Sequence, residues 1–477
     1  MLEQLVLLTV LAGQANMADS VFRVESVKEL HDFKVPWRTA EQSRSAGTAF
    51  LIAQGRVLTN AHVVAGATQL TLTRFDKART VAAQVEAVCT ECDLALLKVS
   101  DDSFFKGLKA FELGEVPSQG SHLVQYGFSA PAPRVSVSEG VLNRLVWNEV
   151  AFTRSDARLM LESDVTANPG SSGGPVTHQG RLVGVHAQGN ATKKGMAQHI
   201  PVSAVRHFLR DLEDGRYDGY PSLPLSFQPL RSDVLRRERG VPAGVSGVVI
   251  SRVVAGGTTD GFTLPGDVLV AIDGRTVDAE GYVDLGHQKI PMFHLFDEKQ
   301  VGEPVALSLI RDGKRVEVKA PSRRLARVDA KREKSLSPPR FLVYAGLVFQ
   351  PLERRLIDTF VSKKSPKLPA EFLWQHALRE WELPEQADRE VVVLTQVLRH
   401  SIHASFAWSG PVVIERVNGR DIDGLASLSA ALTEGKGEFQ AFEFWPHHAL
   451  DVLPRQKADA AHAEILSTYG VGHAQNI

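Results

Sequence analysis

The hydrophobic pattern of the first two hundred residues predicts short β-strands. From residue 20 to about residue 208, β-branched or apolar runs are separated by Gly, Pro, Asn and Ser. A short helical pattern at 202–212 follows them, and such regularly spaced strands are typical of sandwiches and barrels. The expected strands lie at 48–53, 56–59, 69–73, 94–99, 122–126, 140–146, 159–162 and 181–187.

The chain repeats itself beyond a Gly/Tyr/Pro-rich segment at 215–221. Leu225–Leu230 reads LSFQPL and Leu347–Leu352 reads LVFQPL, and an apolar run and then a strand ending in a turn follow each hexamer. Internal repetition indicates homologous modules. We therefore predict two related modules, the second enlarged by a helix-like insert at 371–381.

Composition excludes several classes of protein. The chain has 477 residues, 43% of them hydrophobic and 23% charged, which is typical of packed globular proteins with more than one domain. Its formal net charge is −1, so no global field attracts nucleic acid or an anionic membrane surface. No apolar run is long enough to cross a membrane as a helix. No phosphate-binding GxxxxGK[ST] motif occurs, and we expect no cofactor.

The amino terminus resembles a secretory signal. The apolar run Leu5–Ala12 is followed by the small-x-small site Gly13-Gln14-Ala15, so residues 1–19 are interpreted as a signal peptide. This interpretation predicts a periplasmic or otherwise exported protein. A positive charge before the apolar run is missing, which leaves a cytoplasmic protein as the alternative.

A basic segment separates the two repeat modules. Seven Arg and Lys residues stand against two acidic residues between positions 322 and 340. A solvated linker at 326–340 is the favoured interpretation, because no aromatic residues are interleaved to stack on nucleic-acid bases. A polyanion-binding patch is the alternative.

The motif that carries chemistry is Asn168–Pro175, which reads NPGSSGGP. A nucleophilic serine needs a base and backbone N–H donors for the developing oxyanion, and glycines permit the tight turn that supplies them. The same letters fit the nucleophile elbow of α/β-hydrolases. An elbow requires a following helix, whereas a β-hairpin is expected after Pro175, so this interpretation is disfavoured.

A histidine and an aspartate precede the serine in the order that a chymotrypsin-like triad requires. His62 follows the apolar run VLTNA, and Asp93 opens the apolar run LALLKV. Each residue alone has an ordinary structural explanation, but the three together, in order and with these flanks, predict a catalytic set. Ser172 is the expected nucleophile, His62 the general base and then acid, and Asp93 the residue that orients it.

These three blocks resemble those of the HtrA/Deg family of serine proteases, and the two repeats resemble PDZ domains. The whole chain is most similar to the Deg9-like branch, with one protease and two PDZ modules. The resemblance implies a mainly β fold: a chymotrypsin-like double β-barrel followed by two PDZ-like α+β domains. It also implies ATP-independent endoproteolysis of unfolded or damaged proteins, binding of peptide carboxy termini, and a homo-trimer or hexamer. The expected divisions are 20–215 for the protease, 222–325 and 341–460 for the PDZ modules, and 461–477 for a tail.

The resemblance also assigns the rest of the candidate site. The amides of Gly170, Ser171 and Ser172 form the implied oxyanion hole. The primary pocket is lined by Ala167, Met196 and Ile200. These side chains are small or apolar and imply cleavage after aliphatic residues, whereas His199 stands where the family usually has a small or apolar residue.

Peptide capture by the PDZ modules depends on a loop that resembles Tyr-Leu-Gly-Leu. The second module reads Tyr344-Ala345-Gly346-Leu347 and keeps the glycine, so Gly346 and Leu347 are expected to contact peptides. The first module reads Ser222-Leu223-Pro224-Leu225, where proline removes one N–H donor. Leu223 and Leu225 are its peptide-binding candidates, with protomer assembly as the alternative role of either module.

Two cysteines complete the sequence picture. Cys89 and Cys92 form a C-x-x-C without the helix start of a redox motif or the further ligands of a zinc site, so no metal is expected. A buried Cys92 beside Asp93, with Cys89 incidental, is the favoured interpretation, and a regulatory disulfide is the alternative. Two rivals to the protease remain: a catalytically silent holdase or scaffold with the same fold, and an esterase that uses the same serine.

Overall fold

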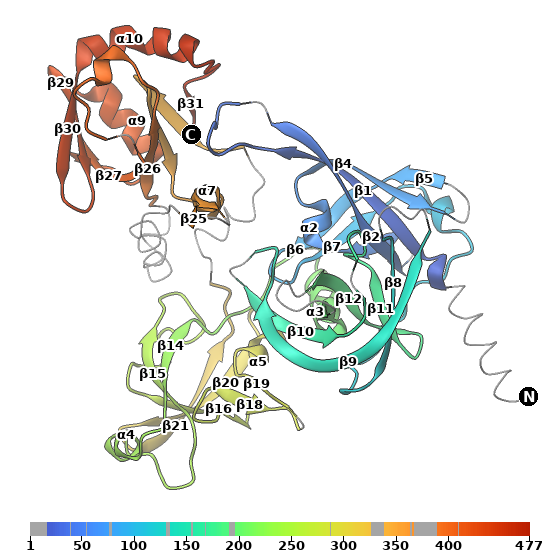
Figure 1. The fold of residues 1–477 in the computed structure, drawn as a ribbon. Helices are drawn as coiled ribbons and strands as arrows, with labels where there is room; N and C mark the ends of the chain where they lie inside the picture. Colours follow the sequence, from blue (N-terminus) through green and yellow to red (C-terminus); the bar gives the residue numbers. More distant parts are fainter. Residues whose placement is uncertain are drawn as a thin grey trace, which may run out of the picture. The chain divides into compact units, whose positions relative to one another are not determined.

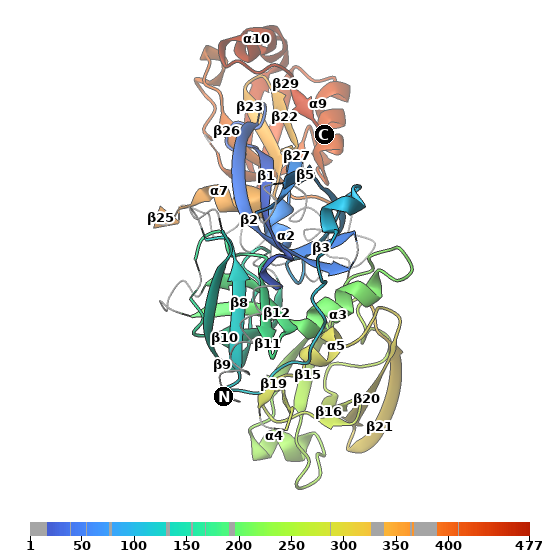
Figure 2. The ribbon, with the colours of Figure 1, turned by 90° about the vertical axis from the view of Figure 1, so that its right-hand side faces the viewer.

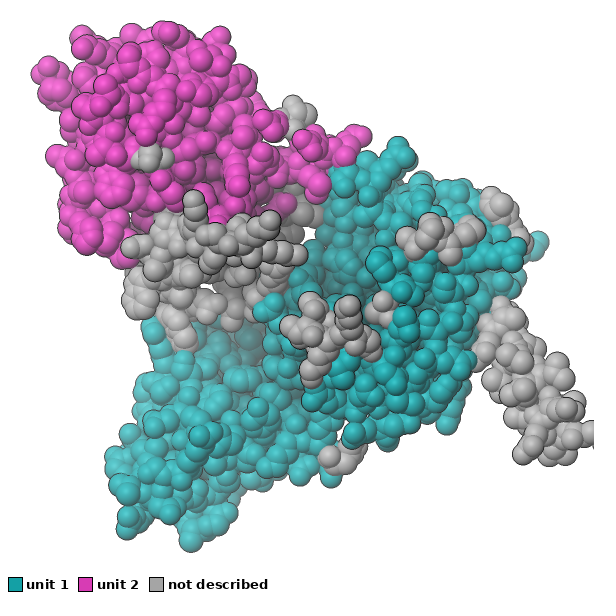
Figure 3. All heavy atoms as spheres, viewed as in Figure 1, with its two compact units in different colours: residues 1–28, 43–325 teal, residues 29–42, 326–477 magenta. Residues whose placement is uncertain are grey.

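The computed structural model describes residues 17–38, 40–53, 55–75, 79–129, 134–153, 156–166, 168–189, 196–286, 288–325, 338–362, 365–366, 389–408 and 410–477. The chain forms two compact units, coloured separately in Figure 3. Unit 1 comprises residues 1–28 and 43–325, and unit 2 comprises residues 29–42 and 326–477. The first repeat module therefore shares a unit with the predicted protease. No helix among these residues is long and apolar enough to cross a membrane.

A seven-stranded sheet forms the first half of the protease region, in the order β5-β4-β1-β2-β3-β7-β6. Alternating positions place Phe22, Leu51 and Leu97 in one buried cluster. The helix α2 (Ala61–Val64) follows β3 directly. The strands are β1 (Val21–Leu30), β2 (Glu41–Ala53), β3 (Arg56–Thr59), β4 (Ala67–Arg74), β5 (Arg79–Ala82), β6 (Gln84–Cys89) and β7 (Leu94–Lys98), and the 3-10 helix η1 (Asp102–Phe105) comes next.

The second half is a closed barrel in the order β10-β13-β12-β11-β8-β9, along which the long strand β9 curves (Figure 1). Closure leaves no free sheet edge. The strands β11 and β12 pair directly after the serine motif, so the predicted hairpin is confirmed. The elements are β8 (His122–Gly127), β9 (Ser136–Glu149), β10 (Ala157–Ser163), β11 (Pro175–His178), β12 (Arg181–Gly189), β13 (Ala197–Pro201) and the helix α3 (Val202–Asp211).

The first repeat module is an antiparallel sheet in the order β14-β15-β16-β20-β21, with β17 beside β16. Its core contains Val248, Leu269 and Leu307. Figure 2 shows its helix α5 close to α3 of the barrel region, and both helices line one pocket. The elements are β14 (Leu225–Pro229), α4 (Asp233–Glu238), β15 (Val248–Val253), β16 (Val268–Ile272), β17 (Arg275–Thr276), β18 (Tyr282–Asp284), β19 (Lys289–Pro291), α5 (His294–Asp297), β20 (Pro304–Arg311) and β21 (Lys314–Pro321).

Unit 2 contains the second module, with a sheet in the order β30-β29-β27-β26-β23-β22-β31 and with β28 beside β27. The predicted linker and helical insert fall mostly outside the described residues. The elements are β22 (Phe341–Tyr344), β23 (Leu347–Pro351), α7 (Arg354–Phe360), β24 (Val361–Ser362), β25 (Ser365–Pro366), β26 (Val392–Val397), η3 (Ser401–His403), β27 (Val412–Val417), β28 (Arg420–Asp421), α9 (Leu425–Glu434), β29 (Phe439–Phe444), β30 (Ala449–Pro454), α10 (Arg455–Thr468) and β31 (Gln475–Asn476).

The carboxy-terminal segment belongs to this second module, which corrects the prediction of a separate tail at 461–477. The helix α10 crosses residue 460, and β31 pairs with β22, with Asn476 opposite Phe341. Residues 29–42, between β1 and β2, also belong to unit 2. There the Trp37 ring centre lies 6.3 Å from that of Phe341, and Gln396 donates to the carbonyl of Lys34 at 2.7 Å.

Candidate active site

His62 and Asp93 form a two-point contact. Nδ1 of His62 lies 2.7 Å from Oδ2 of Asp93, and the backbone N–H of His62 donates to Oδ1 at 2.8 Å. The Asp93 side chain is 4% exposed and that of His62 is 32% exposed. A buried carboxylate at Nδ1 keeps a proton on that nitrogen, so Nε2 is left to accept one.

The strand pairing explains why these two residues meet. The strands β3 and β7 are antiparallel neighbours with Thr59 opposite Ala95, so the residues that follow β3 lie beside those that precede β7. The Asn60 side-chain amide and the Ala61 N–H both donate to the Asp93 carbonyl, at 2.9 and 3.1 Å. Asp93 adopts a φ of 56°, a region that aspartate tolerates better than most residues. These bonds hold the backbone of Asp93 beside the two residues that precede His62.

Lys28 of β1 also binds the backbone of His62, and no motif in the sequence pointed to it. Its Nζ donates to the carbonyl of His62 at 2.7 Å. Burial lowers the pKa of Lys28, while the Asp93 charge acts in the opposite direction. Only strand order places Lys28 here, because it lies 34 positions before His62 in the chain.

Gly173 lets the loop that carries Ser172 reach the end of β3. A Cβ on Gly173 would lie 2.1 Å from the carbonyl oxygen of Thr48 and 2.4 Å from Oγ1 of Thr59, and its φ is +85°. Only glycine fits such a close approach at this φ. The N–H of Thr48 donates to the Ser172 carbonyl at 2.8 Å. Thr59 is the last residue of β3 and stands three positions before His62. The loop that carries Ser172 therefore packs against the end of the strand that leads into His62.

The Ser172 hydroxyl points to a neighbouring carbonyl. Its Oγ lies 3.4 Å from the oxygen of Ala187 in β12. Within the described part of the chain, it makes no hydrogen bond to His62. Contacts between a nucleophile and its base are often long in the free enzyme and tighten when substrate binds. The structure thus brings the three predicted residues to one place without completing the Ser172–His62 hydrogen bond.

Two of the three predicted oxyanion donors are free. The N–H and the hydroxyl of Ser171 both donate to the carbonyl of Asn168, at 3.1 and 2.6 Å. Over the described ranges of the chain, the N–H groups of Gly170 and Ser172 have no hydrogen-bond acceptor. Gly170 has a φ of +96°, which shapes the turn. The Ser171 N–H is therefore already used, whereas those of Gly170 and Ser172 have no partner among the described residues.

The predicted pocket residues have different surroundings. Ala167 lies outside the described residues, and Met196 is half-buried just before β13. Ile200 is 1% exposed and packs with its strand partner Val185 in the core. His199 lies on the opposite face of β13, because side chains alternate along a strand. Its partner there is His186 of β12, a residue that the sequence did not single out.

Cys89 and Cys92 are joined by a disulfide, which corrects the interpretation of Cys89 as incidental. Both residues are buried, as was predicted for Cys92. The bond closes the turn between β6 and Asp93, so it lies one residue from the carboxylate that holds His62. Nowhere in the described residues do three or more His, Cys, Asp or Glu side chains lie where they could hold a metal ion.

The PDZ candidates differ between the modules. Leu223 and Leu225 are 5% and 8% exposed, and the carbonyl of Pro224 accepts the N–H of Val254 at 3.1 Å. In the second module, Gly346 has a φ of +87°, and its carbonyl accepts the N–H of Leu398 at 2.7 Å. Leu347 is fully buried. Both loops are thus packed into their modules.

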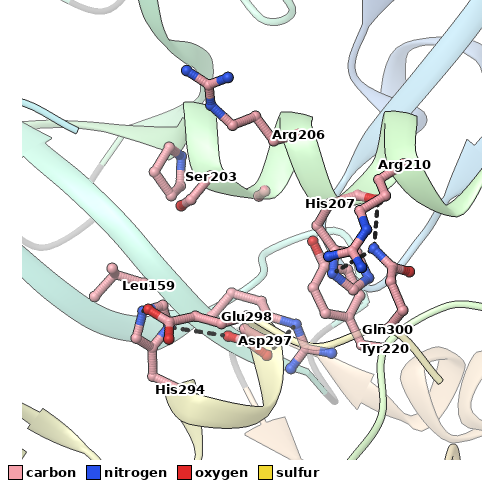
Figure 4. Close-up of a pocket in the computed structure, with 13 residues that line it drawn as sticks. Leu159, Ser203, Arg206, His207, Arg210, Tyr220, His294, Asp297, Glu298 and Gln300 are labelled. Atoms are coloured by element: carbon pink, nitrogen blue, oxygen red, sulfur yellow. Dashed lines mark hydrogen bonds and ion pairs between the residues drawn. The ribbon is translucent and has the colours of Figure 1, made fainter. Parts of the chain in front are cut away.

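A pocket of about 330 Å³ lies within unit 1 where the barrel meets the first repeat module (Figure 4). Arg158 has its guanidinium carbon 4.7 Å from the centre of the Tyr220 ring, and its Nε lies 3.6 Å from Asp297 of α5. The Gln300 side chain donates to the carbonyl of His207 at 3.2 Å. These contacts hold the first repeat module against the barrel.

Two protein families match this chain, one over the protease region and one over the second repeat module. Residues 47–185 match the trypsin-like peptidase domain family, and residues 330–476 match the PDZ domain family. The chain is 29% identical over 467 residues to Protease Do-like 2, chloroplastic, from Arabidopsis thaliana, covering 96% of this chain and 74% of that protein. It is 28% identical over 422 residues to Putative protease Do-like 3, mitochondrial, from the same plant, covering 88% and 72%.

Solved structures agree on the fold. The HtrA-type protease AlgW with a tripeptide has a TM-score of 0.51 and 22% identity, and the match covers 65% of this chain and 95% of that chain. The same protease with a decapeptide has a TM-score of 0.50 and 21% identity, with 65% and 97% covered. The predicted mainly β architecture is thereby confirmed. From the two matched domains and these relatives, we conclude that the chain belongs to the HtrA/Deg family and is a serine-type endopeptidase with trypsin-like and PDZ domains.

Proposed function

We propose that this protease cleaves unfolded or damaged polypeptides without ATP, through an acyl-enzyme on Ser172. The observation that carries the proposal is the two-point contact between Asp93 and His62, at 2.7 and 2.8 Å, beside the glycine-docked Ser172 loop. A carboxylate, an imidazole and a hydroxyl in this order are what acyl transfer to serine requires.

The residues take the following roles. His62 Nε2 removes the proton from Ser172 Oγ while that oxygen attacks the carbonyl carbon of the scissile bond. The N–H groups of Gly170 and Ser172 stabilise the oxyanion. The imidazolium, balanced by Asp93, then donates its proton to the leaving amine. Water attacks the acyl-enzyme with His62 again as base, which releases the acid product and restores the serine.

The PDZ modules supply substrate capture in this proposal. In this proposal an extended peptide adds to a free sheet edge of a module, and backbone N–H groups receive its carboxylate. The substrates are unfolded polypeptides and peptide carboxy termini, and the protein acts as a homo-trimer or hexamer. Light scattering of the purified full chain measures the number of subunits, and a monomer would contradict the assembly part.

We further propose that the protein works in an exported, oxidising compartment. The Cys89–Cys92 disulfide supports this, because disulfides persist outside the reducing cytoplasm. Mass spectrometry of the mature protein from its own cells tests the proposal. A first residue at Asn16 is expected, and a retained Met1 would contradict export.

The experiment that tests the activity is digestion of unfolded casein by the full chain, without ATP or metal. Wild type, Ser172→Ala and Ser171→Ala are compared. Cleavage that is lost only in Ser172→Ala supports the proposal. An uncleaved substrate that is still kept from aggregating would favour the holdase, and ester turnover without casein cleavage would favour the esterase.

A further inference from the structure

Two buried histidines lie behind the serine loop and have no part in the proposed mechanism. His186 in β12 and His199 in β13 are strand partners, 2% and 0% exposed, with their Nδ1 atoms 3.3 Å apart. Burying polar groups is costly unless each finds a hydrogen-bond partner. Such a pair inside a barrel therefore calls for a physical explanation.

His186 is tied directly to the residues that follow the nucleophile. Its N–H donates to the carbonyl of Gly174, and its carbonyl accepts the N–H of Gly173, both at 2.8 Å. The hydroxyl of Ser172 lies 3.4 Å from the carbonyl of Ala187, the next residue along β12. His186 thus stands next to the residues that follow Ser172, on the strand β12 that pairs with β13.

Both buried imidazoles have a lowered pKa. Burial, and after it the charge of His62, lowers the pKa of His186 to about 4. The pKa of His199 is also held well below its usual value, first by burial and then by His186. Both rings are therefore neutral at physiological pH, and each has one donor and one acceptor nitrogen.

A short hydrogen-bond chain links Ser163, His199 and His186. Ser163 Oγ accepts the N–H of Val165 at 3.4 Å and lies 2.7 Å from His199 Nε2, a contact in which either atom can be the donor, and we assign the proton to the Ser163 hydroxyl. His199 then holds its proton on Nδ1 and donates to Nδ1 of His186. The remaining proton of His186 is on Nε2, for which the described residues provide no acceptor. This series of hydrogen bonds thus ends at His186 Nε2–H, which is free to donate.

The chemistry of this donor selects the ligand. A carboxylate has only acceptor oxygens, so it can accept from this donor and brings no N–H group that itself needs an acceptor, whereas a carboxamide does. An approaching carboxylate also favours a protonated imidazole, which the neutral pair can become by taking up one proton. An aliphatic side chain would leave the His186 N–H unsatisfied.

We propose that His186, oriented by His199 and Ser163, determines the primary specificity by binding the side-chain carboxylate of a glutamate or aspartate that precedes the scissile bond. The inference rests on the proposed function, because the pocket selects only what Ser172 cleaves. It differs from the aliphatic preference implied by Ala167, Met196 and Ile200. The physical reason is that Ile200 faces the core, while the buried imidazoles share the other strand face.

The test compares three peptides that differ only in having Glu, Gln or Leu before the cleaved bond. The wild-type full chain should cleave the Glu peptide with a kcat/KM at least about tenfold above those of the Gln and Leu peptides, since a polar pocket rejects analogues that cannot satisfy it. In His186→Val, the Glu-to-Leu ratio should fall at least tenfold. Ser163→Ala should lower the Glu-to-Leu ratio only in part, because it removes the Ser163 hydrogen bond but leaves His199 to orient the His186 ring.

A matched control removes a different buried imidazole of unit 1. His207→Val lies on α3, outside the candidate site, and must leave the Glu-to-Leu ratio at the wild-type value. A wild-type preference for Leu, or a ratio that His186→Val does not change, overturns the proposal. Equal cleavage after Glu and Gln overturns the assignment of a carboxylate.

Binding separates failure of the pocket from failure of the protease. The same peptides, with amidated carboxy termini so that the PDZ loops find no free carboxylate, are titrated into Ser172→Ala by calorimetry. Tighter binding of the Glu peptide than of the Gln and Leu peptides supports the pocket even if wild type cleaves neither peptide nor casein. Equal binding of all three overturns it, whatever becomes of the proposed activity.

Discussion

Asp93 holds His62 at two points, with Oδ2 2.7 Å from Nδ1 of the ring and Oδ1 2.8 Å from the backbone N–H. The second bond ties the carboxylate to the backbone of the residue whose ring it orients. Asp93→Asn keeps the size of the side chain but places an N–H2 group against Nδ1–H or reverses the imidazole tautomer. We expect kcat to fall by roughly ten-thousand-fold, as in other triads of this kind. Unchanged casein cleavage by a folded Asp93→Asn protein would contradict the assigned role.

Gly173 is predicted to be irreplaceable for a steric reason. Gly173→Ala would place a methyl group 2.1 Å from the carbonyl oxygen of Thr48 in β2, so the loop must move away from β2 and carry Ser172 with it. Casein cleavage should be lost. Gly472→Ala is the matched control, because a Cβ there meets nothing within 4 Å. If Gly173→Ala cleaves casein at the wild-type rate, the docking argument is wrong.

Lys28 is predicted to act as a positioning residue for His62. Lys28→Met keeps the length of the side chain but removes the donor to the His62 carbonyl, a bond to a charged group worth about 1.5–3 kcal/mol. We expect kcat to fall at least tenfold while KM for a peptide substrate stays within about twofold. Lys98→Met in β7, where the side chain is exposed, serves as the control. A rise in KM with kcat unchanged would indicate a substrate-binding role instead.

Reduction of the Cys89–Cys92 disulfide should loosen the turn that presents Asp93. The chain-entropy relation gives about 2 kcal/mol for a closed loop of this size. Casein cleavage by wild type should therefore fall in dithiothreitol. The double variant Cys89→Ser/Cys92→Ser should start at the lower rate and not respond to the reductant. A similar response in the double variant would show that the reductant acts elsewhere.

The buried pair of His186 and His199 should make the barrel less stable in acid. The unfolded chain binds protons near pH 6.5 at these residues, whereas in the folded protein burial lowers the pKa of His186 to about 4. The free energy of unfolding must then decrease as the pH falls from about 6.5 to about 4, by about 3 kcal/mol for His186 alone. Hydrogen exchange of β12 and β13 at pH 7 and pH 5 measures this loss of protection. The loss of protection should be smaller in His186→Val/His199→Val. An equal loss in that variant would contradict protonation of the histidine pair as the cause.

The sequence alone was enough to predict the catalytic candidates and the protease fold. His62, Asp93 and Ser172 each stand beside a strand or turn whose local signal is strong, and the hairpin after Pro175 excluded the α/β-hydrolase interpretation. The carboxy-terminal segment was misjudged because its attachment to β22 is a pairing of residues far apart in the chain, Asn476 with Phe341. Such pairings leave little trace in a single sequence.

The supporting residues were missed for a related reason. Lys28 reaches His62 from β1, and His186 meets His199 only through the register of β12 and β13. Neither residue carries a local motif, so only strand order and register reveal them. Cys89 was misjudged because three-residue spacing alone does not tell whether a turn brings the two sulfur atoms together.

The role of Ser172 as nucleophile can be tested by finding where a serine-directed reagent attaches. The full chain is treated with a fluorophosphonate that modifies activated serines, and the peptide containing Ser171 and Ser172 is fragmented in a mass spectrometer. We expect modification at Ser172 in wild type and in Ser171→Ala, and its loss in His62→Ala. Modification at Ser171, or equal modification of Ser172 when His62 is replaced, would contradict this role.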